Sequence, residues 1–377
     1  MSIKKLKVMT VVGTRPEIIK MAMVIKSADK YFDQVLVHTG QNWDYTLNEI
    51  FFKDLGIRQP DYFLESVGSN LGETIGNIIS KSYEVLVKEM PDAILILGDT
   101  NSALSAIPAK RLKIPIFHME AGNRCFDENL PEEINRKIVD HISDINLPYT
   151  EHARRYLLSE GVRKEHVFVT GSPMPEVLEA YKADIAKSKI LSELKLKKDG
   201  YMLISAHREE NIDNPDNFKS LMTALNDIAE KYQMPMIYST HPRALDRLNK
   251  NGFKLHDLIR IHKPFGFFDY NRLQLDSFCV LSDSGTLAEE GAILGFPAVS
   301  LRTSTERPEV LDKGSFLVGG IKTQDILQAI QLTRDMKKNE ELTLPALDYQ
   351  DKNVSVKVIK LIQSYTKIVN YMVWRKN

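Results

Sequence analysis

Short apolar runs rich in β-branched residues alternate along the chain with longer segments in which apolar residues recur at helical spacing. This alternation is typical of βαβ units, in which helices connect parallel strands. The first half of the chain predicts strands over 7–12, 35–39, 93–97, 115–118, 144–147 and 167–170. It predicts helices over 16–28, 45–55, 72–89, 102–112, 132–142 and 151–160. Together these elements indicate one doubly wound α/β domain.

A second series of strands follows a lysine-rich segment of helical pattern, residues 172–200. Its predicted strands cover 201–205, 236–239, 259–262, 279–281, 298–301 and 316–318, and its helices include 217–231 and 287–294. We therefore predict one domain from 1 to 172 and another from 173 to 353, with the last helix, within 354–377, packing back on the first. The predicted fold class is α/β, with two doubly wound Rossmann-like domains that face one another across a cleft.

Length and composition narrow the classes of function. A chain of 377 residues exceeds the usual size of a single core, which agrees with two domains. Its 50 basic and 50 acidic side chains give a net charge of zero, which argues against a nucleic-acid binder or a polybasic protein of the membrane surface. An anionic ligand must therefore be met by individually placed groups.

The cysteines and the apolar runs exclude further classes. Cys125 and Cys279 are too few for a disulfide framework or a zinc cluster, and Cys279 is expected to be a buried strand thiol. No run of about 18 uncharged apolar residues is present, and the apolar stretch near the N-terminus stops at Gly13. We therefore expect a cytoplasmic protein with no membrane span and no nucleic-acid partner.

The first chemically suggestive motif follows the first strand. Gly13 permits a sharp turn into a helix, and Thr14 and Glu17 have the spacing of a capping box. These residues alone favour nothing more than a well-capped helix start. Arg15 adds a guanidinium at that helix N-terminus, where the helix dipole alone supplies only about 0.3–1 kcal/mol toward an anion. With Lys20 as a second cation further along the helix, the motif becomes a candidate diphosphate site.

Carboxylates follow further strands of the same half. Asp99 comes after a glycine at a strand end, where capping the next helix and a functional role are equally good explanations. Glu120 ends an apolar strand where no cap is required, which favours a functional role. Of Glu132 and Glu133, one is expected only to begin its helix, since acidic residues favour the first turn. Carboxylates that converge in one site would push their pKa values apart, which separates acid and base roles.

Three aromatic or imidazole rings of the second half are weaker candidates. A lone histidine is usually structural, but His207 has Arg208 and Glu209 beside it at a strand exit and is a candidate ligand or acid–base group. His241 repeats this placement with lower specificity. Tyr270 could stack on a nucleotide base, and the pattern explains it equally well as a core aromatic residue.

A turn of small residues is the most informative segment of the second half. Ser284, Gly285 and Thr286 lie between a strand and a helix, where backbone N–H groups can bind an anion. Glu290 comes one turn into that helix, where a carboxylate can accept both hydroxyls of a ribose. Arg307 adds a cation from a later segment. The turn alone is a weak signal, but the combination is strong.

These motifs resemble the family of non-hydrolysing UDP-N-acetylglucosamine 2-epimerases over nearly the whole chain. The matching motifs are Gly-Thr-Arg-Pro-Glu at 13–17, Gly-Asp-Thr at 98–100, His-Met-Glu-Ala-Gly at 118–122, Pro-Glu-Glu-Ile-Asn-Arg at 131–136, Ala-His-Arg-Glu-Glu-Asn at 206–211, Asp-Ser-Gly at 283–285 and Thr-Glu-Arg-Pro-Glu at 305–309. Such an ordered set is far more specific than any one of its members.

The resemblance implies a GT-B arrangement, a homodimer, and an isomerase that needs neither a metal nor a nicotinamide cofactor. It implies UDP contacts, mostly in the second domain, at Arg15, Tyr270, Ser284, Gly285, Thr286, Glu290 and Arg307. It implies catalytic positions at Asp99, Glu120, Glu132 and His207, with Lys20 near the phosphates. The implied reaction eliminates UDP to leave a glycal and then adds UDP back after a proton has returned to the other face of carbon 2. The base among the three carboxylates stays open.

Three segments bear on the substrate and on activation by a second UDP-sugar. Residues 41–45 differ from the Gln-His that many members carry, so the resemblance does not extend to the second, activating UDP-sugar site of some bacterial relatives. The loop 123–130 and the segment 170–174 are more similar to the subgroup that forms UDP-N-acetyl-L-fucosamine. We therefore expect inversion either of UDP-GlcNAc to UDP-ManNAc or of UDP-2-acetamido-2,6-dideoxy-L-talose to UDP-L-FucNAc, for surface polysaccharide precursors. A GT-B glycosyltransferase, a hydrolysing epimerase and a UDP-sugar sensor without catalysis are the alternatives.

Overall fold

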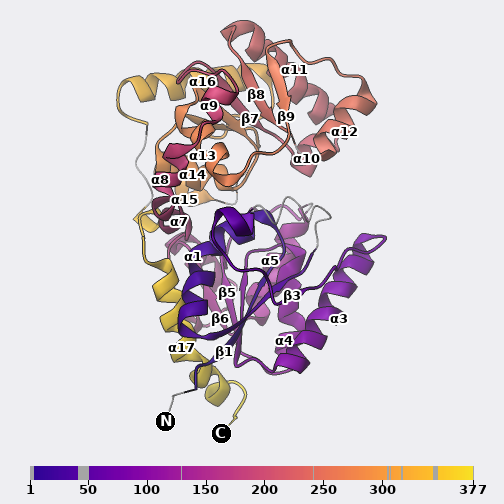
Figure 1. Ribbon diagram of the computed structural model, residues 1–377, viewed down its shortest axis with the longest axis vertical. Helices are drawn as coiled ribbons and strands as arrows, with labels where there is room; N and C mark the ends of the chain where they lie inside the picture. The colour runs from indigo at the N-terminus through magenta and orange to yellow at the C-terminus, as the bar shows by residue number, and fades with distance from the viewer. Residues whose placement is uncertain are drawn as a thin grey trace. The chain divides into compact units, whose positions relative to one another are not determined.

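The computed structural model describes residues 4–40, 51–128, 130–240, 242–303, 305, 307–315, 317–342 and 347–376. The chain forms two compact units, here called unit 1 (residues 1–179 and 350–377) and unit 2 (residues 180–349). Each unit is built on one parallel sheet with helices on its faces (Figure 1). The predicted α/β class with two Rossmann-like sheets is confirmed.

Unit 1 has a six-stranded sheet in the order β3-β2-β1-β4-β5-β6. The strands are β1 (Lys7–Val12), β2 (Asp33–His38), β3 (Tyr62–Phe63), β4 (Ala93–Leu97), β5 (Ile116–Met119) and β6 (Ile145–Leu147). The order reverses at β1 and β4, whose carboxyl ends therefore flank the usual ligand position of a doubly wound sheet. The predicted strand 167–170 pairs only through an isolated bridge between Asn146 and Val167. The carbonyl of Pro148 accepts the backbone N–H of Thr170, but proline has no N–H with which to donate a hydrogen bond back, so the pairing does not continue.

Helices cover both faces of this sheet. They are α1 (Arg15–Tyr31), α3 (Leu71–Glu89), η1 (Asn101–Ser105), α4 (Ala106–Arg111), α5 (Pro131–Ile142), α6 (Glu151–Ser159), η2 (Lys164–His166), α7 (Met174–Ala180) and α17 (Val354–Met372). Helix α1 packs against α17, and α3, α4 and α5 pack together on the other face (Figure 1). The helix predicted over 102–112 is a 3₁₀ turn followed by α4, which places Pro108 in the first turn, where its missing N–H costs no helical bond.

Unit 2 has a five-stranded sheet in the order β11-β10-β7-β8-β9. Its strands are β7 (Met202–Ser205), β8 (Met236–Ser239), β9 (Ile259–His262), β10 (Cys279–Ser282) and β11 (Ala298–Ser300). Its helices are α8 (Lys182–Lys187), α9 (Ile190–Glu193), α10 (Glu209–Ile212), α11 (Pro215–Tyr232), α12 (Pro242–Asn251), α13 (Phe267–Asp276), α14 (Thr286–Leu294), α15 (Pro308–Asp312), α16 (Thr323–Lys338) and η3 (Leu347–Tyr349). The order reverses between β7 and β10, so their ends are neighbours. Of the predicted strand 316–318, Val318 bridges to Ser300 and residue 316 lies outside the described residues.

The local sequence explains where the helices begin. The side chains of Asn70, Thr150 and Asn214 accept backbone N–H groups at the starts of α3, α6 and α11. The apolar faces of these helices then pack on strands whose residues are almost all buried. Within the part of the chain described here, no helix is both long and apolar enough to cross a membrane.

Candidate functional site

The turn from β1 into α1 is organised by a buried carboxylate. Glu17 accepts the backbone N–H of Gly13 at 2.5 Å and of Thr14 at 2.9 Å, and the hydroxyl of Thr100 donates to its other oxygen at 2.5 Å. Burial raises the pKa of Glu17 to about 7, although the three hydrogen bonds oppose this shift. The sequence predicted only a helix cap at Glu17, whereas the structure shows that this carboxylate also ties the turn after β1 to the turn after β4.

The two cations of this turn lie in different surroundings. The Arg15 guanidinium lies over the ring of Phe51, 5.5 Å from its centroid, and is half-buried. Lys20 is buried, and its ammonium group lies 2.7 and 3.0 Å from the two carboxylate oxygens of Glu120. A charge-assisted contact of this kind joins α1 to the end of β5.

Glu120 is the first residue after β5 and is buried. Its φ of +64° lies in the left-handed region, which is unusual for a residue with a side chain. Besides Lys20, its carboxylate accepts the Tyr149 hydroxyl at 3.2 Å and, more weakly, the Asn123 amide at 3.4 Å. None of these contacts satisfies a helix end, so Glu120 does not act as a helix cap here.

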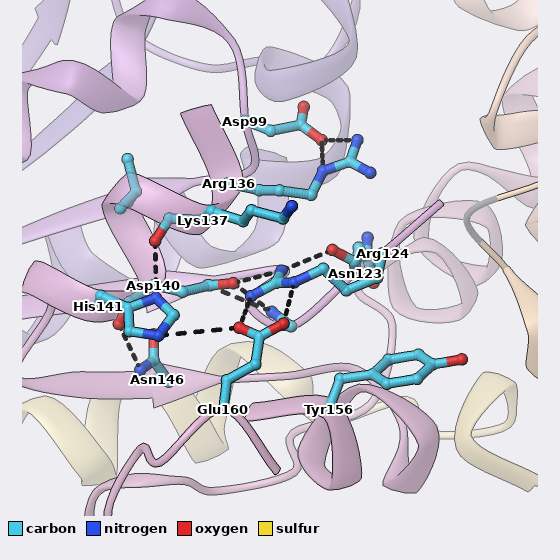
Figure 2. A network of polar contacts seen from close by, with 12 residues as sticks. Asp99, Asn123, Arg124, Arg136, Lys137, Asp140, His141, Asn146, Tyr156 and Glu160 are labelled. Carbon is cyan, nitrogen blue, oxygen red and sulfur yellow. Dashed lines mark hydrogen bonds and ion pairs between the residues drawn. The ribbon is translucent and has the colours of Figure 1, made fainter. Parts of the chain in front are cut away.

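Asp99 follows β4 and is held by a cation from α5. Arg136 donates to one oxygen of Asp99 from Nε at 3.0 Å and from Nη2 at 2.5 Å (Figure 2). The Asn135 side chain donates to the Asp99 carbonyl at 3.0 Å. The Asp99 side chain keeps 23% of its surface exposed, so a carboxylate fixed by its neighbour remains accessible.

The adjacent acids at the start of α5 are in different situations. Glu133 is fully buried, accepts the backbone N–H groups of Cys125 at 3.1 Å and Phe126 at 3.3 Å, and pairs with Arg136 at 2.9 Å. Glu132 is half-buried, and no hydrogen bond or ion pair of its carboxylate is found within the described ranges. Glu133 thus anchors the loop before α5, while Glu132 remains partly exposed at the start of that helix.

A network of alternating basic and acidic side chains connects β5, the loop after it, α5 and the end of α6. His118 on β5 contacts Asp140 at 3.0 Å through Nδ1 and the Gly98 carbonyl at 2.8 Å through Nε2. Asp140 also accepts from Arg124 at 2.7 Å, and Arg124 in turn donates twice to Glu160 (Figure 2). Burial lowers the pKa of His118, but the Asp140 carboxylate outweighs it and raises that pKa above its usual value. The network connects the turn that carries Asp99 with the loop after Glu120.

In unit 2 a buried aspartate shapes the exit of β7. Asp283, directly after β10, accepts the backbone N–H groups of His207 and Arg208, each at 2.9 Å, and the Asn211 amide at 3.0 Å. The His207 imidazole Nδ1 lies 3.8 Å from Asp283, and 34% of the His207 side chain is exposed. The predicted acid–base candidate therefore lies where two neighbouring strands end, and the Asp283 carboxylate holds its backbone N–H.

The small-residue turn before α14 has fewer open donors than the sequence predicted. The N–H of Ser284 donates to the Ser282 hydroxyl at 3.1 Å, and the N–H of Thr286 makes a long contact of 3.4 Å with the Ser284 hydroxyl. Ser284, Gly285 and Thr286 are all half-buried. An anion that binds at this helix N-terminus would therefore have to displace the serine hydroxyls that now accept the backbone N–H groups of Ser284 and Thr286.

The remaining predicted residues of unit 2 are held around α14. Glu290 is buried and accepts the Gln274 amide at 2.6 Å. Arg307 pairs with the buried Glu289 at 2.7 Å. Tyr270, on α13, is half-buried and packs against an apolar cluster of unit 2.

The structure brings several of the predicted residues of unit 1 together. Lys20 contacts Glu120, and Asp99 reaches Arg136 on the helix that also carries Glu132. Residues 41–45 and His241 lie outside the described residues. Among the described residues, no group of three or more His, Cys, Asp or Glu side chains is placed to hold a metal ion.

Comparisons with known proteins agree on one family. A family model described as UDP-N-acetylglucosamine 2-epimerase matches residues 26–363. The UDP-N-acetylglucosamine 2-epimerase of Methanococcus maripaludis is 35% identical over 364 residues, which cover 94% of this chain and 98% of that protein. The structure of UDP-N-acetylglucosamine 2-epimerase from Rickettsia bellii is similar with a TM-score of 0.92 and 49% identity, covering 99% of this chain and 100% of that one.

A further solved structure carries ligands. The Methanocaldococcus jannaschii UDP-GlcNAc 2-epimerase in complex with UDP-GlcNAc and UDP has a TM-score of 0.89 and 32% identity, and the match covers 95% of this chain and 99% of that one. The family match spans both units, and the relatives are matched over nearly their whole length. The chain therefore belongs to the UDP-N-acetylglucosamine 2-epimerase family and is an isomerase.

Proposed function

We propose that this enzyme is a non-hydrolysing UDP-N-acetylhexosamine 2-epimerase that interconverts UDP-GlcNAc and UDP-ManNAc. The observation that carries the proposal is the set of acidic residues at neighbouring elements of unit 1. Asp99 is fixed by Arg136, Glu120 is buried against Lys20, and the Glu132 carboxylate has no partner within the described ranges. Three carboxylates in three different surroundings suit a reaction that needs distinct proton acceptors and donors.

We propose that unit 2 binds most of the UDP moiety. The N-terminus of α14, with Ser284, Gly285 and Thr286, would receive the diphosphate, because helix N-termini favour anions. Glu290, whose carboxylate Gln274 holds at 2.6 Å, would accept the ribose hydroxyls.

Three further residues complete the proposed UDP contacts. Tyr270 would lie against the uracil ring, since it is half-buried rather than fully enclosed. Arg307 would stabilise negative charge on the leaving group, and Arg15 of unit 1 would add a second guanidinium. Support for UDP as the ligand comes from the M. jannaschii relative, which was solved with UDP-GlcNAc and UDP.

The proposed chemistry begins at the bond to UDP. The hydrogen at carbon 2 is not acidic, so the bond between carbon 1 and the diphosphate oxygen breaks first and its electron pair leaves with UDP. Positive charge on carbon 1 then allows a carboxylate to remove the proton, and the C–H electrons form the double bond of a glycal. A proton returns to the opposite face of carbon 2, and UDP adds back to carbon 1. Acid–base help contributes about 10² to 10⁴ in rate, so the cations around departing UDP supply much of the rest.

We assign roles in this reaction to five predicted residues. Asp99, Glu120 and Glu132 would share the removal and return of the proton at carbon 2. His207, half-exposed beside Asp283, would donate a hydrogen bond or proton to the departing UDP. Lys20, paired with Glu120, would keep that carboxylate ionised while the diphosphate is bound nearby.

A 6-deoxy sugar is a second candidate substrate. The loop 123–130 and the segment 170–174 are similar to those of enzymes that form UDP-N-acetyl-L-fucosamine. In this case the enzyme would invert carbon 2 of UDP-2-acetamido-2,6-dideoxy-L-talose. Relative kcat/KM for the two UDP-sugars distinguishes these proposals.

We also propose that the enzyme is a homodimer, which light scattering after size exclusion tests. We further propose a role in supplying precursors of surface polysaccharides.

Incubation with UDP-GlcNAc in deuterated water tests the main proposal. Deuterium at carbon 2 of a sugar still joined to UDP is the expected result. Release of free amino sugar and UDP would instead identify a hydrolysing epimerase. Transfer of the sugar to an acceptor would identify a glycosyltransferase, and binding without exchange at carbon 2 would identify a sensor.

A further inference from the structure

The backbone of Glu120 is held in an unusual conformation by the end of β6. Its φ of +64° lies in the left-handed region, which residues with a side chain rarely adopt. The Glu120 N–H donates to the carbonyl of Leu147, the last residue of β6, at 3.2 Å. The conformation turns the chain sharply at the point where β5 ends, so the carboxylate meets groups from α1 and from the segment after β6.

Tyr149 belongs to that same segment and reaches the Glu120 side chain. It lies two residues after Leu147, and its hydroxyl donates to Glu120 Oε2 at 3.2 Å. The Tyr149 side chain is fully buried, and its ring lies under the Lys20 ammonium group, 5.9 Å from the centroid. The end of β6 therefore fixes both the backbone and the carboxylate of Glu120.

Donors of different kinds surround the two carboxylate oxygens. Oε2 accepts from Lys20 at 2.7 Å and from Tyr149, while Oε1 accepts from Lys20 at 3.0 Å and from Asn123 at 3.4 Å. A lysine ammonium on a flexible stem supplies charge but little directional control. A phenol on a buried ring has a fixed direction, so it can set the rotation of the carboxylate plane.

We propose that Tyr149 is a positioning residue of the 2-epimerase reaction, which holds the Glu120 carboxylate in one orientation and keeps it ionised for proton exchange at carbon 2. The inference rests on the proposed function. Tyr149 carries no charge and belongs to none of the strand-end motifs, so no pattern along the chain marks it as functional.

The test compares two substitutions that each remove one buried hydroxyl and keep the ring. Tyr149→Phe removes the donor to Glu120. Tyr201→Phe is the matched control, because Tyr201 is also fully buried and donates its hydroxyl at 2.7 Å to the Leu273 carbonyl in unit 2. Both purified proteins are checked by thermal unfolding and by calorimetric titration with UDP before kinetics are measured.

In Tyr149→Phe we expect kcat for deuterium exchange at carbon 2 to fall about 3- to 30-fold, with KM changed by less than about twofold. The acidic limb of the kcat profile moves to higher pH, because a carboxylate that loses a donor is protonated more easily. Tyr201→Phe should retain the wild-type kcat and profile. A purely structural role for Tyr149 would lower stability without moving the pH profile.

A second measurement does not depend on turnover. Carbon-13 NMR of labelled glutamate carboxyl groups follows the titration of Glu120, whose resonance is identified by its loss in Glu120→Gln. The midpoint should rise in Tyr149→Phe and not in Tyr201→Phe. An unchanged midpoint, or a kcat profile that matches the control, would overturn the inference. Failure of the wild type to place deuterium at carbon 2 would instead count against the proposed function, and the NMR comparison would still report on the contact.

Discussion

Glu17 should make unit 1 less stable as pH rises toward neutrality. Its carboxylate is 2% exposed, and burial raises its pKa from the ordinary 4.5 to about 7. That difference corresponds to about 3 kcal/mol between the two protonation states. The folded protein binds this proton more tightly than the unfolded chain does, so the free energy of unfolding falls as pH rises between the two values.

Glu17→Gln removes this contribution while keeping an acceptor for the N–H groups of Gly13 and Thr14. We therefore expect the stability of the wild type relative to the variant to fall by about 2–3 kcal/mol between pH 5 and pH 8. Urea unfolding followed by tryptophan fluorescence measures this difference in unit 1, because Trp374 belongs to that unit and the sequence has no tryptophan between residues 180 and 349. Other groups that titrate in this range cancel when the two proteins are compared at each pH.

Glu73→Gln is the matched control. Glu73 also accepts a backbone N–H near a helix start, that of Ser69 at 2.6 Å, but it is exposed, and its hydrogen bonds to Ser69 hold its pKa below the usual value. Its stabilising effect is present above the ordinary pKa and is lost only as the pH falls below it, so this variant should show no slope between pH 5 and pH 8. Parallel stability curves for the wild type and Glu17→Gln would refute the reasoning.

Three further substitutions test the site. Arg136→Lys replaces two guanidinium hydrogen bonds to Asp99 by a point charge, and we expect kcat to fall about 10-fold with little change in UDP affinity measured by calorimetry. Glu132→Gln should lower kcat about 10²- to 10⁴-fold in the deuterium-exchange assay yet leave the thermal midpoint unchanged, and a wild-type rate would exclude Glu132 from proton transfer. Arg307→Met leaves the carboxylate of Glu289 buried beside an apolar side chain, so urea unfolding should show a loss of about 3–5 kcal/mol, which adding Glu289→Gln should partly restore.

The strand ends could be predicted because their chemistry is local. A charged residue within three positions of the end of an apolar run, as at Arg15, Asp99 and Glu120, marks the carboxyl edge of a parallel sheet without any knowledge of distant contacts. Strands β1, β4, β8 and β9 were predicted with the bounds that the structure has. Strand β3 was missed because two residues are too few to show any periodicity.

The partners of these residues could not be predicted. Lys20 and Glu120 are 100 positions apart in the chain. The sequence pattern predicted a diphosphate as the partner of Lys20 and did not indicate a buried carboxylate. His118 and Asp140 each lie in ordinary strand and helix patterns, so nothing marked them as a pair. The spacing of Glu17 is fully explained by its capping contacts, so nothing along the chain indicated a further contact. That further contact, which ties two turns together, depends on Thr100 from the turn after β4. Pairings of this kind follow from how strands are ordered in space rather than from spacing along the chain.

The return of α17 to α1 has a consequence for biosynthesis. Unit 1 is assembled from both ends of the chain, and α17 contributes buried residues such as Val358, Ile362 and Val369 to it. During translation the sheet of unit 1 emerges first, but one face of α1 must wait until all of unit 2 has left the ribosome. Unit 2, whose segments are contiguous, can reach its native state earlier. The nascent protein therefore exposes the apolar face of α1 that α17 later covers, and it does so for most of its synthesis. This is the stage at which a chaperone would be most useful to it.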